Sequence, residues 1–458
     1  MTGHIAILGA GPTGLGAAHR LGELGIEDWS IHERNDHVGG LSSSITDDNG
    51  FIWDHGRHVM FSHYPYFDDL VEKTLRTDYD EHLREAWVWL HNRFVPYPFQ
   101  NNIHRLPAEV FMECIMGIIE AQRSTPAAAN FDEYIASVFG SGIAEHFMRP
   151  YNFKVWAHPL EMMGTSWQGD RVPTVDVRRI LQNLLDDRDD VSWGPNNKFK
   201  FPLLGTGMLY ERLAASLAKP VQFRRNAVAV DPVARVVTFD DGTLVQYDSL
   251  VSTLPLTELV PAIEGAPVEV LAALDDLHHT EGLFIGIGVA DPCPSTKCWM
   301  YFPETSSPFY RVTYLSNYSP NMTPGPGHFS LLAEVSMSPY KLEDPETIVE
   351  EAIAGMVACE LLTPEQADTK IVSRQLMHVP YSYPVPTTRR DSALAVIQPW
   401  LMKNQIYSRG RFGAWRYEIG NTDHSVMMGV ELADHLVTGT NETTWALLPG
   451  EEARAVIR

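Results

Sequence analysis

The stretch from His4 to Ser42, HIAILGAGPTGLGAAHRLGELGIEDWSIHERNDHVGGLS, decides the fold of this chain. Its apolar start, residues 4–8, predicts a buried β-strand, and residues 15–24 continue with helical periodicity. Between them lie three glycines in G-x-G-x-x-G spacing: Gly9, Gly11 and Gly14. Such glycines permit a tight turn, the approach of a pyrophosphate and close helix–strand packing, and the helix N-terminus favours phosphate. Glycine turns also occur for packing alone, but the strand before this turn and the helix after it predict dinucleotide binding.

A second predicted strand, residues 29–32, ends in Glu33. Its separation from Gly9 is close to the roughly 20-residue spacing at which a carboxylate accepts hydrogen bonds from a ribose. Gly39 and Gly40 follow, and this E-x5-G-G arrangement resembles the large family of flavin amine oxidases and their relatives. In that family a second glycine turn approaches the flavin diphosphate. FAD is therefore the expected cofactor, with contacts from Glu33, from both of these glycines and from the three glycines of the first turn.

The composition limits the class of protein. A chain of 458 residues has the length for two or three domains. Its formal net charge of −23 argues against nucleic acid or an anionic membrane surface as a partner. Four cysteines form no C-x-x-C pair and are expected to be reduced. No apolar run approaches the length of a membrane span, and the first strand begins too early for a signal peptide, so we expect a cytoplasmic protein.

The histidines do not form a pattern typical of a metal site. His55, His58 and His63 are near neighbours, but there is no H-x-x-x-H pair and no Cys/His cluster to accompany them. From spacing alone each is expected to be structural, and the sequence predicts no metal.

The middle of the chain predicts a helical domain inserted into the nucleotide-binding fold. From residue 106 to about residue 187, apolar side chains recur with helical spacing. This segment also carries three cations that are candidate anion contacts: Arg149, Lys154 and Arg171. A solvated surface charge is the alternative for each of them, and it is favoured more strongly for Lys154 than for Arg171.

Capping patterns predict individual helix ends. Asn130 and Glu133 form a capping pair at the start of one helix, and Gly140 can end that helix. A later helix is predicted over residues 344–359, with Asp344 as its cap.

Strands are predicted on both sides of the helical segment. Residues 87–95 alternate enough to form one strand, and residues 222–253 form several strands joined by turns. In flavoproteins of this broad class such a hairpin completes the FAD domain, with a backbone contact to adenine near Val228. An antiparallel sheet is predicted from four successive runs: 283–289, 297–302, 309–315 and 329–335.

Several local strings narrow the resemblance to one family. They run through nearly the whole chain: GAGPTGLGAA, GRHVMFSHY, VPYPFQNN, FMRPYNFKVWA, WGPNNKFKFP, KCWMYFPE, PFYRVTYLSNYSP and SRGRFGAWRYEIGN. Together they closely resemble the flavin-dependent UDP-galactopyranose mutases of the eukaryotic type. Amine oxidases share the first forty or so residues but not the later strings, so the later strings carry the specific signal.

The resemblance implies an α/β fold built from a discontinuous Rossmann-like FAD-binding domain, an inserted α-helical domain and an antiparallel β-sheet domain. The FAD-binding domain would comprise residues 1–85, 196–277 and 406–458. The substrate sheet would comprise residues 86–102 and 278–405. The helical substrate domain, with a mobile loop, would comprise residues 103–195, and the active site would lie between the three parts.

In this family the enzyme is an isomerase that interconverts UDP-galactopyranose and UDP-galactofuranose with no net redox change. Reduced flavin N5 attacks the anomeric carbon as UDP leaves, and the flavin N5–sugar adduct opens. The ring then closes through the other hydroxyl and UDP returns, which is covalent catalysis with a cofactor as nucleophile. The resemblance therefore implies a nucleotide-sugar substrate and FAD that is active when reduced, with NADPH or NADH as reductant.

The resemblance also assigns roles to individual positions. Residues expected around the uracil, ribose and sugar are Tyr97, Phe99, Gln100, Asn152, Trp156 and, on a second mobile loop, Asn196. The diphosphate would meet planar arginine forks and tyrosine hydroxyls: Arg171, Arg311, Tyr301, Tyr383 and Tyr417. Those expected beside the flavin and the sugar are His58, Arg411 and Asn421. The catalytic group implied is thus His58, Arg171, Arg311, Arg411 and Asn421.

The chain departs from the family pattern in several places. Gly56-Arg57 stands where the eukaryotic-type enzymes usually have a glycine pair before His58, and Thr422 replaces the usual Gln. The loop after Tyr318 and the C-terminal tail are shorter than in fungal relatives. We therefore assign no oligomeric state from the resemblance.

Two other functions remain open from the sequence. Gln100 would read uracil and thymine alike, so the substrate could be another nucleotide sugar, such as dTDP-galactose, UDP-arabinose or a deoxysugar. An ordinary flavin oxidase of amines or polyenes is the other alternative. It predicts an apolar tunnel and oxygen consumption, and it does not need Arg171 together with Arg311.

Overall fold

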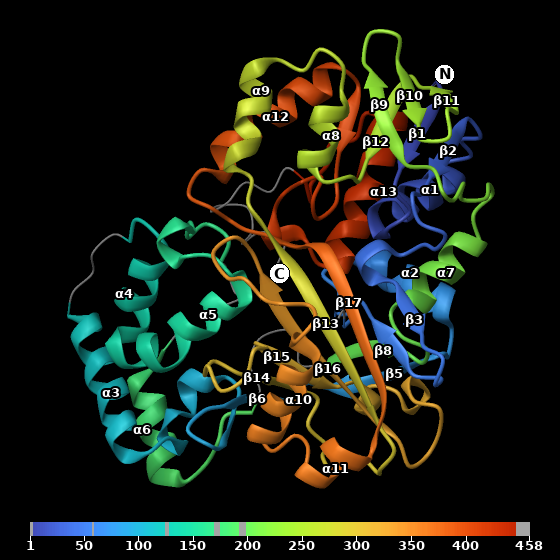
Figure 1. Cartoon of the computed structure of the whole chain (residues 1–458). Helices are drawn as coiled ribbons and strands as arrows, with labels where there is room; N and C mark the ends of the chain where they lie inside the picture. Colours follow the sequence, from blue (N-terminus) through green and yellow to red (C-terminus); the bar gives the residue numbers. More distant parts are fainter. Residues whose placement is uncertain (1–2, 57–58, 124–127, 169–174, 192–197, 446–458) are drawn as a thin grey trace.

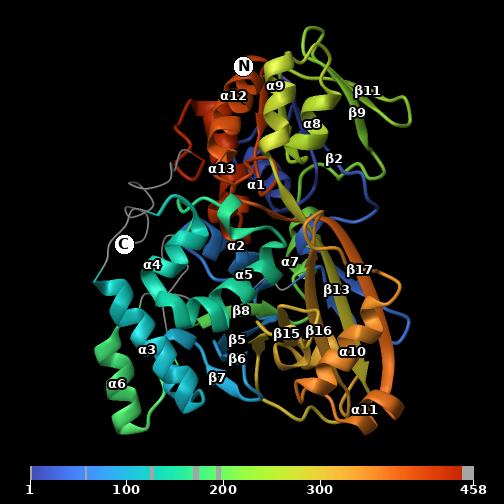
Figure 2. The same ribbon diagram turned by 60° about the vertical axis from the view of Figure 1, so that its left-hand side comes forward.

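The computed structural model describes residues 3–56, 59–123, 128–168, 175–191 and 198–445. Three layers of structure meet near the centre of the molecule (Figures 1 and 2). A nucleotide-binding sheet with its helices occupies one end, a group of helices lies to one side, and a long twisted sheet lies opposite those helices. The division of the chain into domains at the expected residue numbers stays a prediction.

Four parallel strands form the nucleotide-binding sheet, in the order β18-β12-β1-β2. Their bounds are β1 (Ile5–Leu8), β2 (Trp29–His32), β12 (Ser249–Ser252) and β18 (Ile406–Ser408). The predicted strand over residues 29–32 is confirmed, and the predicted first strand is confirmed to within one residue. These strands come from distant parts of the chain. The sheet is therefore complete only after the chain has returned to it twice, at β12 and at β18.

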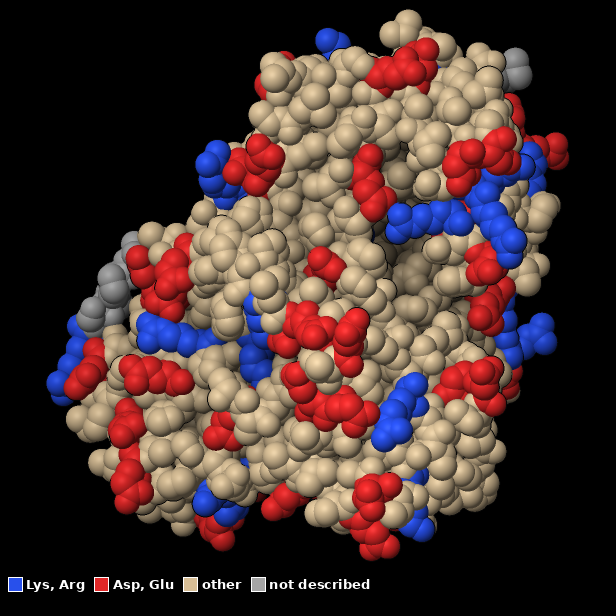
Figure 3. Space-filling model, in the orientation of Figure 1, with Lys and Arg blue, Asp and Glu red and all other residues tan. Residues whose placement is uncertain are grey.

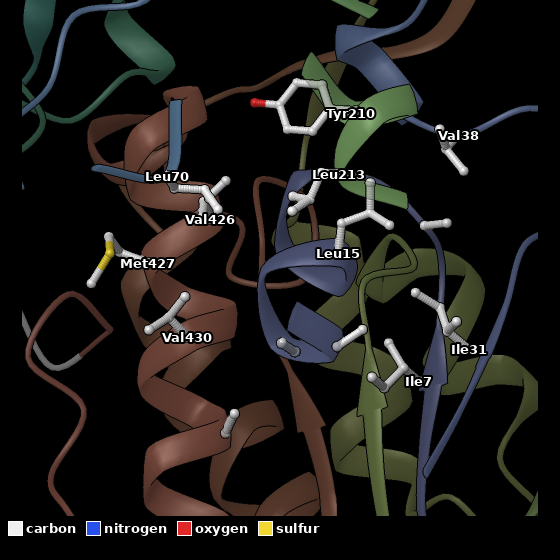
Figure 4. Close-up of a cluster of buried hydrophobic side chains, with 14 of the residues drawn as sticks. Ile7, Leu15, Ile31, Val38, Leu70, Tyr210, Leu213, Val426, Met427 and Val430 are labelled. Carbon is white, nitrogen blue, oxygen red and sulfur yellow. The ribbon is translucent and has the colours of Figure 1, made fainter. Parts of the chain in front are cut away.

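Helices α1 (Pro12–Glu23) and α13 (Thr422–Thr438) pack very closely beside this sheet. A Cβ on Gly16 would lie 2.6 Å from the carbonyl oxygen of Val426, and a Cβ on Gly429 would lie 2.0 Å from that of Thr13. Both contacts therefore require glycine. Apolar side chains of the sheet and of the surrounding helices fill the core (Figure 4): Ile7, Leu15, Ile31, Leu70, Leu213, Val426 and Val430.

A seven-stranded sheet forms the second layer, in the order β17-β13-β16-β15-β14-β6-β7. Its strands are β6 (Ala86–Trp89), β7 (Phe94–Pro96), β13 (His279–Val289), β14 (Trp299–Tyr301), β15 (Arg311–Tyr314), β16 (Phe329–Met337) and β17 (Ile371–Pro384). All neighbouring strands are antiparallel except β14 and β6, which are parallel. The single strand predicted over residues 87–95 is wrong, because the chain turns back there and forms the hairpin of β6 and β7.

The helical layer contains α3 (Ala108–Gln122), α4 (Phe131–Ile143), α5 (Arg149–Trp156) and α6 (Val177–Asp186). Asn130 caps α4 by accepting a hydrogen bond from the backbone N–H of Glu133, as predicted. Gly140 interrupts the regular helix as predicted, since its φ of +73° and ψ of 170° are non-helical and two helical segments meet there across a kink. Glycine is required at this point, because a Cβ would lie 2.1 Å from the carbonyl carbon of Gly117 in α3.

Smaller elements connect these layers. The remaining helices are α2 (Pro65–Leu75), α7 (Gly207–Ala215), α8 (Leu256–Ala262), α9 (Val268–Ala273), α10 (Ile348–Ala358), α11 (Pro364–Thr369) and α12 (Arg390–Lys403). The remaining strands are β3 (Ser44–Thr46), β4 (Ile52–Asp54), β5 (Tyr79–Leu83), β8 (Lys198–Pro202), β9 (Ala227–Asp231), β10 (Val236–Phe239) and β11 (Leu244–Gln246). The predicted cap at Asp344 is wrong, since α10 follows Thr347 and Asp344 belongs to the preceding turn, where it accepts a hydrogen bond from the N–H of Glu346 (2.9 Å).

Acidic side chains are spread over the face of the molecule in Figure 3, with smaller groups of basic side chains between them. No continuous basic surface is visible on that face, in keeping with the net charge of −23. In the described part of the chain, no helix combines the length and the apolar character needed to cross a membrane.

Candidate functional site

At the N-terminus of α1, two glycine turns expose backbone that carries no side chains. Gly9 has a φ of +98°, which residues with side chains rarely adopt. A Cβ on Gly14 would lie 1.9 Å from the carbonyl oxygen of Gly9, so α1 can begin this close to the turn only with glycine there. The second turn faces the first, since a Cβ on Gly40 would lie 3.5 Å from the Cα of Gly11. Gly39, with a φ of +98°, shapes that second turn.

Glu33 lies at the end of β2 and is almost fully buried. Its carboxylate accepts hydrogen bonds from the backbone N–H groups of Ala10 (2.8 Å) and Asn35 (2.9 Å). An ionised carboxylate has about four acceptor positions, so two remain for ribose hydroxyls. Val228 is half exposed on β9, at the edge of a separate three-stranded sheet. The glycine turns, the helix N-terminus and Glu33 thus fit the diphosphate and ribose of FAD, and the individual contacts stay predictions.

A pocket with about 270 Å³ of open space lies between the second glycine turn and the seven-stranded sheet. It is lined by Leu41, His55, Gly56, Phe284, Arg311, Glu334, Ser382, Tyr383 and Arg411. Three residues expected at the site, Arg311, Tyr383 and Arg411, are therefore brought together here. The segment with His55 and Gly56 leads into Arg57 and His58, which lie outside the described residues, as do Arg171 and Asn196.

Arg311 begins β15 and faces Glu334, its register partner on β16. Its Nε donates to Oε1 of Glu334 (2.6 Å), its Nη2 donates to Oε2, and the Tyr310 hydroxyl also donates to Oε2 (2.9 Å). Burial opposes the charge of Arg311, but Glu334, Tyr383 and Tyr310 raise its pKa overall, so it stays cationic. This pairing fixes the guanidinium plane. Because Nε and Nη2 are directed at Glu334, Nη1 is left for an anion in the pocket.

An aromatic cluster adjoins this pocket. The ring of Trp156 lies 4.8 Å from that of Tyr417 and 5.9 Å from that of Tyr383. The rings of Tyr97 and Tyr301 lie 5.4 Å apart, and all five side chains belong to or pack against one hydrophobic cluster. Burial and the neighbouring Tyr301 raise the pKa of Tyr97, so its hydroxyl stays protonated and can donate. The structure therefore brings these five expected site residues together.

Gln100 is buried beside the aromatic cluster, and its Oε1 has no hydrogen-bond partner among the described residues. An unsatisfied buried acceptor costs about 1–3 kcal/mol, which a ligand N–H would relieve. Phe99 packs in the helical core, with its ring 4.5 Å from that of Phe147. Asn152 is also buried, and its amide donates to the carbonyl of Met148 (2.7 Å). Gln100 thus offers an unpaired polar atom for a base.

The loop between β18 and α13 carries Arg411 and Asn421. Nη1 of Arg411 lies 3.4 Å from the carbonyl oxygen of Ser382, and its Cζ lies 5.5 Å from the centre of the Tyr383 ring. Gly420 lies against this side chain, since a Cβ there would be 3.4 Å from Cγ of Arg411. Asn421 is the N-cap of α13, but its side chain makes no capping hydrogen bond. The loop therefore places Arg411 in the wall of the pocket and Asn421 at the start of α13.

Sequence reasoning missed two members of the aromatic cluster. Arg84 lies with its Cζ 4.7 Å from the centre of the Tyr97 ring and 5.2 Å from that of Trp299. Among the described residues no carboxylate pairs with it, and nothing in its local sequence indicates a site. Tyr151 meets the Tyr301 ring edge-on at 5.4 Å. Its place in the string that also contains Asn152 and Trp156 was the available signal.

Glu334 was also missed, although it is a lone acid in an otherwise apolar strand, FSLLAEVSM. The two other cations considered in the helical segment do not line the pocket. Arg149 pairs with Asp132 of α4 at 2.6 Å. Lys154 is only 7% exposed, so its interpretation as a solvated surface charge is wrong.

His63, Asp423 and His424 form a compact group at the first turn of α13. Nδ1 of His63 lies 2.7 Å from Oδ2 of Asp423, and Nδ1 of His424 lies 3.0 Å from Oδ1. Burial would raise the pKa of Asp423, but the hydrogen bonds from both histidines lower it. These groups bond to one another and tie the segment after His58 to the first turn of α13. The absence of a metal site stays a prediction.

Comparison with known proteins places the chain in a class of flavoproteins. A family model for flavin containing amine oxidoreductases matches residues 12–399. A candidate protoporphyrinogen oxidase from Exiguobacterium sp. 255-15 is 16% identical over 96% of this chain and 100% of that one, with a TM-score of 0.73. A CLA-producing fatty acid isomerase from P. acnes is 15% identical over 95% and 99%, with a TM-score of 0.64. At such low identity these two structures show the shared fold only.

One crystal structure is far more similar. Reduced UDP-galactopyranose mutase is 45% identical, covers 99% of this chain and 98% of that chain, and has a TM-score of 0.95. Within the flavin-containing amine oxidoreductase class, the chain therefore belongs to the UDP-galactopyranose mutase family.

We predict that Gly14→Ala weakens FAD binding. The added Cβ would meet the Gly9 carbonyl at 1.9 Å, so α1 must move away from the turn. Overpacking of this kind costs about 1–3 kcal/mol or more, equivalent to roughly ten- to hundredfold in affinity. FAD content after gel filtration and titration of the apoprotein measure the effect. Gly22→Ala is the matched control, since nothing lies within 4 Å of a Cβ there. Equal FAD affinity in both variants would contradict the assignment.

Proposed function

We propose that this chain is a UDP-galactopyranose mutase that interconverts UDP-galactopyranose and UDP-galactofuranose without net oxidation. The observation that carries the proposal is the 45% identity over 99% of the chain to a protein of that activity. It is supported by a pocket that brings Arg311, Tyr383 and Arg411 together and reaches Leu41, directly after the second glycine turn. An amine or polyene oxidase does not need the guanidinium fork of Arg311, whereas a nucleotide diphosphate does.

The reaction breaks the bond between the anomeric carbon and the diphosphate and forms it again after the ring has changed size. The chemistry that FAD supplies when bound and reduced is a nucleophilic ring nitrogen. Arg311 would bind the departing diphosphate, and Glu334 would hold its guanidinium at a fixed angle. The hydroxyls of Tyr301, Tyr383 and Tyr417 would donate to the same oxygens. Preorganised donors of this kind stabilise charge as it develops and keep the leaving group in place for its return.

The nucleoside would lie between α5 and the strand that precedes Gln100. The unpaired Oε1 of Gln100 would accept from the N–H of uracil, while Tyr97, Asn152 and Trp156 would enclose the base, ribose and sugar. Phe99 would support this wall from the helical core. Thymine offers the same N–H, so we propose galactose attached to uridine diphosphate as the substrate on the strength of the family, and other nucleotide sugars are outcomes of the test.

Residues outside the described part of the chain enter the proposal from the family resemblance. Arg171 would be the second diphosphate clamp, Asn196 would approach from a second loop, and His58 would lie beside the flavin. Arg411 and Asn421 would act near the flavin and the sugar, next to the pocket they adjoin. We also propose the domain boundaries given above, since the three parallel-sheet segments fall within the expected FAD-binding portions.

We further propose that NADPH or NADH reduces the flavin. The sequence has one strand–G-x-G-x-x-G–helix unit, which the glycine turn at Gly9–Gly14 occupies. A nicotinamide nucleotide would therefore visit the substrate pocket and depart before the sugar nucleotide binds.

We predict that isomerisation requires reduced flavin and yet consumes no reductant. Under anaerobic conditions, dithionite or NADPH should activate the conversion of UDP-galactofuranose to UDP-galactopyranose. Each reduction of the flavin should support many turnovers, and chromatography of the products measures the conversion. A panel of nucleotide sugars in the same assay tests the sugar and the base. Equal activity of the oxidised protein, or one reductant consumed per product, would contradict the proposal and favour an oxidoreductase.

We predict that Arg311→Lys lowers kcat/KM by about a hundredfold, because lysine keeps a charge beside Glu334 but loses the planar fork. Retaining that charge avoids leaving a buried carboxylate unpaired, which would threaten folding. Arg374→Lys is the control, since Arg374 lies on β17 of the same sheet and is half exposed in a long contact with Glu350. UDP affinity by calorimetry should fall in the first variant only. Unchanged affinity in both would mean that Arg311 is not the clamp.

A further inference from the structure

Lys154 connects the helical layer to the seven-stranded sheet. It lies on α5, is 7% exposed, and its ammonium group donates to the carbonyl oxygens of Glu304 (2.9 Å) and Ser307 (2.8 Å). The Ser307 hydroxyl lies 3.4 Å from the same nitrogen. All three acceptors belong to the turn between β14 and β15, so one buried side chain joins the helix to that turn.

The turn determines where two expected diphosphate ligands lie. β14 ends at Tyr301 immediately before it, and β15 begins at Arg311 immediately after it. Its outer side packs on α10, where a Cβ on Gly355 would lie 2.9 Å from Cβ of Ser307. The turn is therefore held between α10 on one side and Lys154 on the other.

Helix α5 determines where the expected nucleoside ligands lie. Asn152 and Trp156 flank Lys154 at a spacing of two residues, so any movement of the helix moves all three together. A second tie holds the end of α5, where the Ser338 hydroxyl donates to the carbonyl of Ala157. The Ser338 hydrogen bond connects α5 to the end of β16. Of the two contacts, only that of Lys154 connects α5 to the β14–β15 turn.

The bridge consists of a charged donor and neutral acceptors. The charged and titratable groups around it are Lys341, Cys359, Glu343 and Glu304. Lys341 forms its own ion pair with Glu343, so that carboxylate is already engaged. The backbone carbonyl of Glu304, and not its side chain, accepts from Lys154. Burial, and then Lys341, lower the pKa of Lys154 to about 7.

We propose that Lys154 is a positioning residue that sets the distance between the nucleoside wall on α5 and the diphosphate wall on β14 and β15. The inference rests on the proposed function, because the two walls meet the two ends of one nucleotide sugar. The protonated form makes charge-assisted hydrogen bonds, which are roughly twice as strong as neutral ones. Loss of the proton loosens the bridge without removing any group that touches the substrate.

The consequence is a pH dependence of substrate binding near neutrality. UDP-galactose is a suitable probe, because its diphosphate is esterified at both ends and does not titrate in this range. Affinity should be highest below pH 7, where Lys154 is protonated, and should fall as the pH rises through 7. The difference between a charged and a neutral hydrogen bond predicts about a five- to tenfold weaker Kd at pH 8.5 than at pH 6.

Calorimetric titration of the oxidised, FAD-containing protein with UDP-galactose at pH 6 and 8.5 tests the proposal without requiring turnover. Lys154→Met removes the charge and should bind about five- to tenfold more weakly than wild type at pH 6, with little further change at pH 8.5. Lys154→Arg keeps the positive charge at both pH values, so its affinity for UDP-galactose should not depend on pH either. This second variant tests the proposal even if the Met variant does not fold. Arg149→Met is the matched control, since Arg149 lies on the same helix but pairs with Asp132 away from the turn. It should retain the wild-type affinity and pH dependence.

Wild-type affinity that does not change between the two pH values would overturn the role of Lys154. A wild-type pH dependence that persists in both the Met and the Arg variants would overturn it as well. In either case the binding of UDP-galactose itself would leave the proposed function standing. Failure of the wild-type protein to bind UDP-galactose at both pH values would instead contradict the proposed function.

Discussion

The rest of the structure depends on close backbone packing of three segments: α1, the turn after β1, and α13. Glycines allow these segments to touch with no side chain between them. Added Cβ atoms at Gly14 and Gly429 would lie 1.9 and 2.0 Å from backbone oxygens, so neither helix could approach as it does. The same packing fixes the N-terminal part of α1 against that of α13, since Gly429 lies against Thr13 and Gly16 against Val426. One set of backbone contacts therefore arranges the glycine cradle and the loop with Arg411 and Asn421, and it joins the first and last parts of the chain.

Electrostatics sets a second requirement. A chain with a net charge of −23 repels a nucleotide diphosphate unless cations are concentrated locally. In the proposed function Arg311 would meet this need, but a buried guanidinium is costly unless it is paired. Glu334 and Tyr310 supply that pairing and also restrict the orientation of the fork. Lys154 is a buried cation of a different kind. Neutral oxygens, not a carboxylate, accept its hydrogen bonds, and these bonds join the helical layer to the sheet.

Much of the nucleotide-binding fold could be predicted from the sequence because its signals are local. The glycine spacing and the apolar runs of β1 and β2 lie within the first forty or so residues, and their strand bounds agree with the structure. The long strand β17 was missed because Pro380 interrupts it. The structure tolerates this proline because β17 is an edge strand and its register with β13 shifts between Thr280 and Gly282, opposite that point. The break in the helix at Gly140 was predicted, but the close approach of Gly117 on another helix, which requires glycine there, could not be.

The candidate site was only partly predictable, for a physical reason. Tyr97, Trp156, Tyr301, Tyr383 and Tyr417 were named from resemblance, and the structure gathers their rings together. The pairing of Arg311 with Glu334 depends on the register of two strands, and the environment of Arg84 depends on packing between distant segments. The local sequence does not indicate which partner either arginine meets, although Glu334 is the lone acid of its strand. The buried state of Lys154 similarly follows from the turn it faces.

The central claim is that this site breaks the bond from the sugar to the diphosphate and remakes it while both fragments stay bound. Positional isotope exchange tests this most directly. UDP-galactopyranose carrying 18O in the bridge between the anomeric carbon and the β-phosphorus would be incubated with reduced protein and examined by 31P NMR. The account predicts that the label moves into non-bridging β-phosphate positions, because the freed diphosphate can rotate before it returns. Formation of UDP-galactofuranose with the label entirely retained in the bridge would contradict it.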